Sequence, residues 1–335
     1  MKHNSHTWAL VLAAGEGSRL RSLTTTSPGI AIPKQFCSLF GGPSLLEEAT
    51  RRAIHAAPVE RVCVVVAAQH RRWWENTLEY LPGENVIVQE ENRGTAHGIL
   101  LSITHILVRD PDAVVAILPA DHYLGDEQPL RAALCGARNL AAKSTKAVFL
   151  LGIEPDGPDI ELGYIVPRAG SKRSPDKVQR FVEKPTIARA QQLLDAGALW
   201  NAFVIVALGR ALLALFEKRC LETTLRMLTV ARRGYNTALA AASAIRLYQQ
   251  LSSVDFSRDI LEGQESMLRV LRVPNCGWSD LGTPQRVAQV LRRVPSNLLA
   301  VARASSSASP VNLAVQYFRS QSDAQCETSI SAQPA

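Results

Sequence analysis

The feature that most constrains the fold is an alternation of apolar runs with segments of helical spacing through the first half of the chain. The apolar runs are residues 8–14, 61–68, 85–89, 113–123 and 147–153. Strands that are apolar on both faces are typical of a parallel sheet with helices on each side. We therefore predict an α/β fold, with helices at 70–81 and at 43–57, where Ser44 and Glu47 form a capping box.

The second half of the chain is less regular, and its composition changes near the end. Thr283 is placed to cap a helix whose first residue is Pro284, which is a favourable start for a helix. From about Pro295 onward the residues become small and polar, as in flexible segments. We interpret residues 1–292 as one folded domain and residues 293–335 as a flexible C-terminal tail.

Residue types that bind metals or stack on bases give no strong signal on their own. The six cysteines are scattered without a Cys-x-x-Cys pair, which argues against a disulfide framework or a zinc site and favours a reducing cytoplasm. His97, His105 and His122 have no recognised zinc spacing, so they are expected to pack or to cap. Trp73 and Trp74 are expected to pack as well.

Charge and hydropathy narrow the class of partner. The polar first residues and the short apolar runs predict neither a signal sequence nor a membrane span. The net charge of +7 comes from dispersed Lys and Arg, with no basic stripe interleaved with aromatic residues. We therefore expect a solvated basic surface and no nucleic-acid partner, and a homo-oligomer stays open.

A glycine loop follows the first apolar run, at the segment Gly-Glu-Gly-Ser-Arg of residues 15–19. A dinucleotide fingerprint would need a third glycine where Leu20 stands, and the P-loop pattern Gly-Lys-Ser/Thr is missing. What is left is a loop whose backbone N–H groups and arginine suit phosphate oxygens. A plain strand-to-helix turn with two glycines explains the segment equally well.

Charged residues further along the chain strengthen the phosphate hypothesis. Lys34 follows the loop closely, and Asp121 comes just after a buried strand. Carboxyl ends of strands in open α/β sheets are where ligands bind. Lys184 and Asp280 add a second lysine and a second aspartate, although each of these residues by itself also suits a turn or a solvated surface.

Taken together and in this order, the motifs resemble those of the sugar-1-phosphate nucleotidyltransferase family, and most of all mannose-1-phosphate guanylyltransferases. The resemblance covers residues 8 to 292 and rests on the glycine loop and on the segments PKQFCSLFGGPSLLEE, RGTA, LPADH, LGYI, FVEKP, LWNAF and GWSDLG. It implies a Rossmann-like, mostly parallel mixed sheet with helices on both faces, the fold of nucleotide-diphospho-sugar transferases. Residues 1–292 would then be the nucleotidyltransferase domain.

The resemblance also implies a reaction, in which a sugar-1-phosphate oxygen attacks the α-phosphorus of a nucleoside triphosphate and pyrophosphate leaves. Positioning and electrostatics supply most of such catalysis. The implied catalytic residues are Arg19, Lys34, Asp121 and Asp280. Of these, Asp121 and Asp280 match the family aspartates that hold Mg²⁺, a cation that accepts few carboxylates together with phosphate oxygens.

Binding residues are implied in the same way. The nucleotide would be bound by Gly15, Glu16, Gly17, Ser18, Arg19, Lys34, Gln89, Gly94 and Thr95. The sugar phosphate would be bound by Gly163, Glu183, Lys184 and Asn201. Thr95 is equally well explained as a helix N-cap.

Two departures from the family pattern bear on function. Ala14 stands where the family has a second glycine, which is tolerable if the position needs no positive φ. Phe203 lies where small polar and glycine residues are usual, so it bears on which sugar fits. The sequence favours GTP and mannose-1-phosphate giving GDP-mannose. Two alternatives are the same transfer with UTP or dTTP and glucose-1-phosphate, and a non-catalytic nucleotide-sugar sensor of the same fold.

Overall fold

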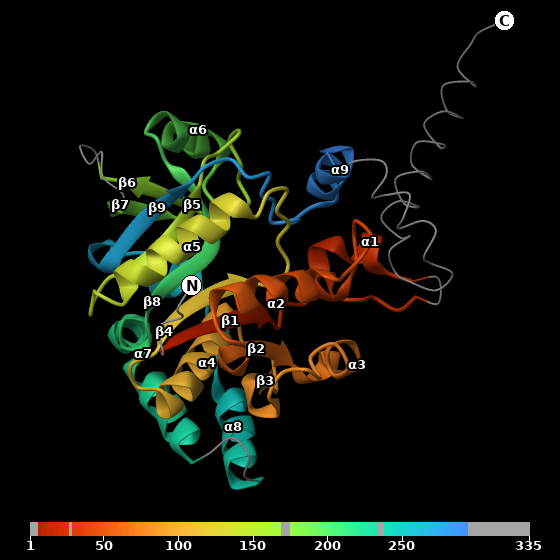
Figure 1. The fold of residues 1–335 in the computed structure, drawn as a ribbon, viewed down its shortest axis with the longest axis vertical. Helices are drawn as coiled ribbons and strands as arrows, with labels where there is room; N and C mark the ends of the chain where they lie inside the picture. The colour runs from red at the N-terminus through yellow and green to blue at the C-terminus, as the bar shows by residue number, and fades with distance from the viewer. Residues whose placement is uncertain (1–5, 27–28, 169–174, 234–237, 294–335) are drawn as a thin grey trace, which may run out of the picture.

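The computed structural model describes residues 6–26, 29–168, 175–233 and 238–293. In this part of the chain one sheet contains the strands β1 Thr7–Ala13, β2 Val62–Ala67, β3 Val86–Gln89, β4 Val114–Pro119, β5 Val148–Ile153, β6 Tyr164–Pro167, β7 Asp176–Val182, β8 Leu199–Leu208 and β9 Leu268–Val273. Their order is β3-β2-β1-β4-β8-β5-β9-β7-β6 (Figure 1). The predicted tail, 293–335, lies outside the described residues except for Arg293.

The first four strands form the parallel half of the sheet. β1 pairs in parallel with both β2 and β4, and β2 pairs in parallel with β3. Every residue of β2 and of β4 is buried, as expected for strands covered on both faces. The second half is mainly antiparallel, because β8 runs against β4 and β5, and β7 runs against β6 and β9.

Helices cover both faces of the sheet, which confirms the predicted fold class (Figure 1). The described helices are α1 Arg21–Thr24, α2 Leu45–Ala56, α3 Arg71–Trp74, α4 Thr95–Arg109, α5 Gln128–Ala141, α6 Ile187–Asp195, α7 Gly209–Arg232, α8 Ala238–Gln250 and α9 Pro284–Arg293. Apolar side chains of α2, α5 and α6 share one hydrophobic core, and those of α4 and α7 share the core on the opposite face.

Local signals set several helix ends. Ser44 and Glu47 form the predicted capping box at the start of α2, and α9 begins at Pro284 after Thr283, as predicted. The helix predicted over 70–81 is wrong in length, since α3 ends at Trp74 and turns follow. The residues after Trp74 include Asn, Thr and a closing Pro, which are poor helix formers.

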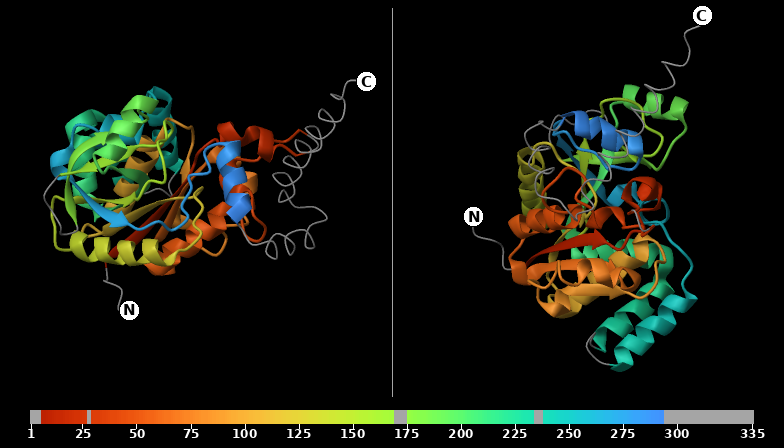
Figure 2. Two further views of the ribbon diagram at one scale, coloured as in Figure 1. Left: turned by 90° about the horizontal axis from the view of Figure 1, so that it is seen from above. Right: turned by 90° about the vertical axis from the view of Figure 1, so that its right-hand side faces the viewer.

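The C-terminal part of the described chain returns to the N-terminal loop. Leu281 and Val287 pack with Leu20 and Leu23 in a third hydrophobic cluster. Figure 2 shows α9 beside α1, although their sequences are far apart. This contact brings Asp280 to the same region as the glycine loop.

Candidate active site

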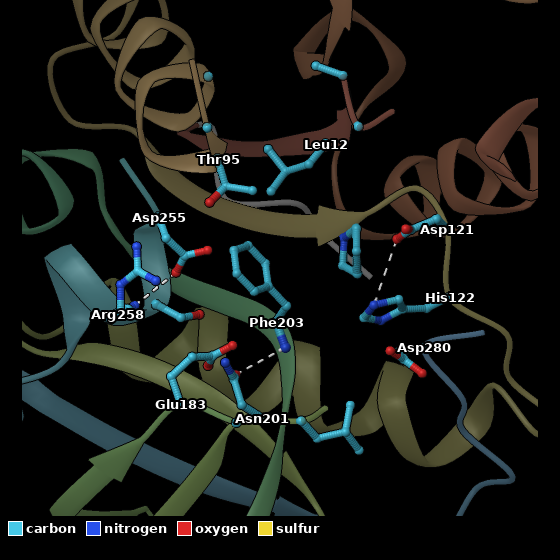
Figure 3. Close-up of a pocket in the computed structure, with 18 of the residues that line it drawn as sticks. Leu12, Thr95, Asp121, His122, Glu183, Asn201, Phe203, Asp255, Arg258 and Asp280 are labelled. Carbon is cyan, nitrogen blue, oxygen red and sulfur yellow. Dashed lines mark hydrogen bonds and ion pairs between the residues drawn. The ribbon is translucent and has the colours of Figure 1, made fainter. Parts of the chain in front are cut away.

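A cavity of about 600 Å³ opens where the parallel strands end (Figure 3). β1 and β4 are paired so that Leu12 lies opposite Pro119, and the loops that follow them therefore leave the sheet side by side. Open α/β sheets bind ligands at this edge. The predicted site residues that line the cavity are Gly15, Arg19, Gln89, Gly94, Thr95, Asp121, Gly163, Glu183, Lys184, Asn201 and Asp280.

The glycine loop is shaped by close backbone packing. Gly17 has a φ of +61°, and a Cβ at this position would lie 2.6 Å from the backbone nitrogen of Lys34. Only glycine meets both conditions without strain. The Nε2 atom of Gln35 donates to the carbonyl oxygens of Ala13 at 3.0 Å and Gly15 at 2.8 Å, which holds the start of the loop in place.

The loop faces two directions. Arg19 lines the large cavity, where its guanidinium donates to Glu161 at 2.8 Å. Glu16 and Gly17 instead line a separate cavity of about 80 Å³, and Ser18 lines neither of the two. The structure therefore brings Arg19 to the other predicted site residues, but it turns Glu16 and Gly17 away from them.

Asp121 and Asp280 lie on the same side of the large cavity (Figure 3). Between their loops, the buried Nζ of Lys34 lies 3.0 Å from Oδ2 of Asp121 and donates to the carbonyl oxygen of Asp280 at 2.6 Å. Burial acts to raise the pKa of Asp121, but the charge of Lys34 and other basic neighbours outweighs it, so the pKa is lowered. Lys34 itself does not line the cavity; it joins the two aspartate loops.

Asp280 is oriented by a second cation that the sequence reasoning missed. Its Oδ1 lies 2.5 Å from Nη1 of Arg286 and accepts the backbone N–H of Gly282 at 3.0 Å. Arg286 also pairs with Asp159. Within the described part of the chain, Oδ2 of Asp280 has no hydrogen bond, and this leaves one carboxylate oxygen for a ligand.

Two aspartates of the cavity could hold a magnesium ion if a substrate supplied further oxygen ligands. Among the described residues no group of three or more His, Cys, Asp or Glu could hold a metal. Two carboxylates on one cavity wall are the donor set that Mg²⁺ accepts when waters and phosphate oxygens fill its other positions. Asp121 and Asp280 are thus the residues here that suit this ion.

His122 follows Asp121 and also lines the cavity. Its Nδ1 accepts the indole N–H of Trp278 at 3.2 Å, and its Nε2 lies 3.8 Å from Oδ1 of Asp121. Burial lowers the pKa of His122 to about 4, and the ring is therefore neutral near pH 7. A neutral ring that accepts at Nδ1 carries its proton on Nε2, toward Asp121.

The opposite end of the cavity gathers the residues predicted for the sugar. The backbone N–H of Asn201 donates to the carbonyl oxygen of Gly163 at 2.8 Å. A Cβ on Gly163 would lie 2.5 Å from Oε2 of Glu183, so glycine lets the carboxylate come close to the backbone. The structure therefore brings Gly163, Glu183 and Asn201 together. All three are distant in sequence from Asp121 and Asp280.

Glu183 has an unusual electrostatic environment. Burial is the largest effect on its carboxyl group, and the nearby charge of Asp255 adds to it, while Lys184 opposes both; the pKa rises to about 7. Asp255 and Arg258 line the same part of the cavity and lie beside Glu183 in Figure 3. Lys184 lines the cavity from an exposed position with a φ of +45°.

Phe203 points into the cavity from β8 (Figure 3). Its φ of +53° is a left-handed conformation, which glycine adopts without strain and phenylalanine rarely does. Its backbone N–H donates to Oδ1 of Asn201 at 3.1 Å, and its ring packs 6.1 Å from that of Phe256. By contrast, Ala14 is not among the residues with positive φ, so the methyl group is tolerated there.

The third part of the cavity lies at the N-terminus of α4, near the buried Gln89. Gly94 is the N-cap, with a φ of +87°, and a Cβ there would clash with the carbonyl oxygen of Val254. The alternative in which Thr95 is the N-cap is therefore wrong. Its Oγ1 instead accepts the backbone N–H of Phe256 at 3.0 Å, which joins the start of α4 to the segment that carries Asp255.

Other residues singled out in the sequence serve packing. Trp74 is buried, and its indole N–H donates to the carbonyl oxygen of Ala67 at 2.9 Å. His97 is buried on α4 and contacts the carbonyl oxygen of Ser252 at 3.0 Å. Burial and the adjacent Arg109 lower the pKa of the buried His105 to about 4. The packing interpretation is thus confirmed for Trp74, His97 and His105, whereas His122 lines the cavity.

A family model described as nucleotidyl transferase matches residues 8–297. The chain belongs to this family. The match covers every predicted site residue.

This nucleotidyl transferase is similar in sequence to two named bacterial proteins. It is 29% identical over 281 residues to xanthan biosynthesis protein XanB of Xanthomonas campestris pv. campestris, covering 82% of this chain and 57% of that protein. It is 29% identical over 291 residues to mannose-1-phosphate guanylyltransferase of Escherichia coli K12, covering 83% and 58%. The chain thus spans less than two thirds of the length of these relatives.

A solved structure supports the same fold. The chain is similar to a Thermus thermophilus protein named mannose-1-phosphate geranyltransferase, with 27% identity and a TM-score of 0.72, over 87% of this chain and 80% of that one. A Helicobacter pylori structure named mannose-6-phosphate isomerase has a TM-score of 0.60 at 21% identity, over 82% of this chain and 99% of that one, which shows the fold alone.

The structure of this nucleotidyl transferase adds cavity residues that sequence reasoning missed. They are Asp255, Arg258 and Trp278, together with Arg286 behind Asp280. Trp278 stands within the quoted segment GWSDLG, two residues before Asp280, and this closeness in sequence was a signal that could have found it. No comparable local signal marks the others. In the described residues, no helix combines the length and apolar character that crossing a bilayer requires.

Proposed function

We propose that this protein transfers a guanylyl group from GTP to mannose-1-phosphate, giving GDP-mannose and pyrophosphate. One observation carries the proposal: a single cavity joins the paired aspartates, the start of α4 and the sugar-end residues. Two anionic reactants must meet in such a transfer, and positive groups on both sides favour that. The names of the relatives support the choice of base and sugar.

The triphosphate is assigned to the wall formed by the glycine loop. The backbone at Gly15 and the guanidinium of Arg19 line that wall and suit phosphate oxygens. Arg19 is held by the half-exposed Glu161, from which a phosphate can take it over, because surface ion pairs are weak. Lys34 is a positioning residue, because its ammonium group contacts both aspartate loops. Its positive charge also lies near the wall assigned to the triphosphate.

Asp121 and Asp280 would hold Mg²⁺, which when bound supplies a Lewis acid for the α-phosphate and the attacking phosphate. The chain's own contribution is to orient both carboxylates. Lys34 does this for Asp121 and also lowers its pKa, and Arg286 orients Asp280. His122 adds a neutral N–H on the side of Asp121.

The sugar phosphate is assigned to the opposite wall. Oδ1 of Asn201 is already occupied by the N–H of Phe203, so its NH₂ group is the part free to donate to a hydroxyl. Glu183 offers acceptors for further hydroxyls, and Lys184 offers a cation for the phosphate. Phe203 lines this wall, so its ring bears on which sugar fits.

The test is pyrophosphate release with Mg²⁺ across four nucleoside triphosphates and a panel of hexose-1-phosphates. We expect turnover with GTP and mannose-1-phosphate. Asp280→Asn should lower kcat by at least about a hundredfold. The matched control is Asp195→Asn, at the exposed end of α6, which should keep wild-type turnover. Circular dichroism of both variants checks that the fold is intact.

Other outcomes would replace parts of the proposal. Turnover only with UTP or dTTP and glucose-1-phosphate would keep the reaction and change the substrates. No pyrophosphate release with any substrate pair, with nucleotide binding retained, would instead favour a nucleotide-sugar sensor of the same fold. No pyrophosphate release and no nucleotide binding would contradict both the enzyme and the sensor.

A further inference from the structure

A second cavity, of about 400 Å³, lies between α2 and α5, away from the site described above. These two helices lie next to each other on one face of the sheet (Figure 1). Its charged and polar lining includes Arg52, His55, Glu127, Gln128, Arg131 and Arg138. A volume of this size suits a small molecule.

Three arginines line the cavity, against one carboxylate, that of Glu127. Arg52 is buried and already pairs with Glu127 at 2.7 Å and with Glu48 at 3.3 Å. Arg131 is exposed, and it forms no ion pair within the described part of the chain. Nε of Arg138 is buried without a hydrogen-bond partner among the described residues. Nη1 of Arg138 donates to the carbonyl oxygen of Ala56, and no acid pairs with this guanidinium among the described residues. The lining therefore carries more positive than negative charge, which suits an anion.

Arg52 connects this cavity to the aspartate loop. Besides its ion pairs, its Nη1 donates to the carbonyl oxygen of His122 at 3.4 Å. His122 and Glu127 both belong to the segment between β4 and α5, which also carries Asp121. An anion that draws on Arg52 therefore changes the contacts that hold the Asp121 loop.

We propose that the cavity between α2 and α5 binds the phosphate group of a small molecule, and that this binding changes turnover through Arg52. Guanidinium groups bind phosphate oxygens in a bidentate manner, and the lining supplies three of them. The regulatory half of this proposal rests on the proposed transfer activity, whereas the binding half does not. The site controls the reaction from behind the catalytic loop, without contact with either substrate.

Binding is tested by calorimetric titration of the full chain with inorganic phosphate and with glycerol 3-phosphate. Because the main cavity also binds phosphate in the proposed function, Arg19→Ala and Lys184→Ala are combined to remove that contribution. In this background, Arg131→Ala should weaken binding about five- to tenfold. Lys143→Ala, just after α5 and outside the cavity lining, should leave it unchanged. Equal affinities in all three proteins would overturn the site.

The two probes distinguish the sources of the phosphate group. Tighter binding of glycerol 3-phosphate assigns the site to a phosphate ester. Equal or tighter binding of inorganic phosphate assigns it to the free ion. Either ranking supports the site, provided that Arg131→Ala weakens both probes.

Control of the reaction is tested by kcat at saturating substrates, with and without the tighter probe. Competition at the main cavity changes KM, whereas control through Arg52 changes kcat. We expect kcat to change in the wild type and Lys143→Ala at the same probe concentration, and Arg131→Ala to need about five to ten times more probe for the same change. The same response in all three proteins would overturn the control. If no substrate pair is turned over, the affinity for nucleotide is the readout, with the same pattern expected.

Discussion

Glu183 gives a test of the cavity's electrostatics that needs no substrate. Burial and the nearby charge of Asp255 raise the pKa of its carboxyl group from 4.5 to about 7. The folded protein therefore binds this proton more tightly than the unfolded chain does. Stability from this residue is fully present below about pH 4.5 and is lost as the pH rises through 7, because the charged form is disfavoured in the fold.

The size of this effect follows from the displaced pKa. Each tenfold change in proton affinity corresponds to about 1.4 kcal/mol, so the full change from 4.5 to about 7 amounts to roughly 3 kcal/mol. Glu183→Gln cannot ionise and avoids this loss. We expect the free energy of unfolding of the variant, relative to wild type, to rise by about 3 kcal/mol between pH 4.5 and pH 8.

Urea unfolding at several pH values measures the difference. Glu79→Gln provides the baseline, because its side chain is exposed and does not line the cavity. The reasoning is refuted if the relative stability of Glu183→Gln follows that of Glu79→Gln across the range. It is equally refuted if the variant loses stability relative to wild type as the pH rises.

Three further predictions concern the backbone and the metal. Gly94→Ala should destabilise the fold by at least about 2 kcal/mol, because Gly94 has a positive φ and an added Cβ would clash with Val254. The control Gly83→Ala should change thermal stability little, because the space around Gly83 is open. Equal melting temperatures of the two variants would contradict this prediction. Gly163→Ala should raise KM for the sugar phosphate more than it lowers stability, because the added Cβ meets the movable end of Glu183; an unchanged KM would count against that placement. A chelator should abolish turnover while leaving the urea midpoint unchanged, and a lower midpoint would point to a structural metal.

The parallel half of the fold could be predicted because its signals are local. Each of β1, β2 and β4 is a contiguous apolar run, and the capping box of α2 lies within four residues. The positions of the strands of the second half in the sheet could not be predicted from local signals. β8 enters between β4 and β5, and β9 pairs with β5 over a long sequence separation. Such pairings depend on which surfaces meet in three dimensions.

Some residues of the candidate site are marked by a local motif, and others are not. Arg19, Asp121 and Asp280 could be named from motifs, since each stands at a recognisable turn. The grouping of Asp255 with Glu183 has no local signal, because the two belong to segments far apart in the chain. The raised pKa of Glu183 follows from that grouping and from burial.

By itself, the sequence determined the order of the strands along the first half, the helix starts at Ser44 and Pro284, and the motifs that place this chain among nucleotidyl transferases. Tertiary structure decided that Lys34 joins two aspartate loops and that Arg286 orients Asp280. The physical reason is that periodicity and capping act over a few residues. Ion pairs and burial depend on chain segments that meet only when the sheet and α9 are assembled.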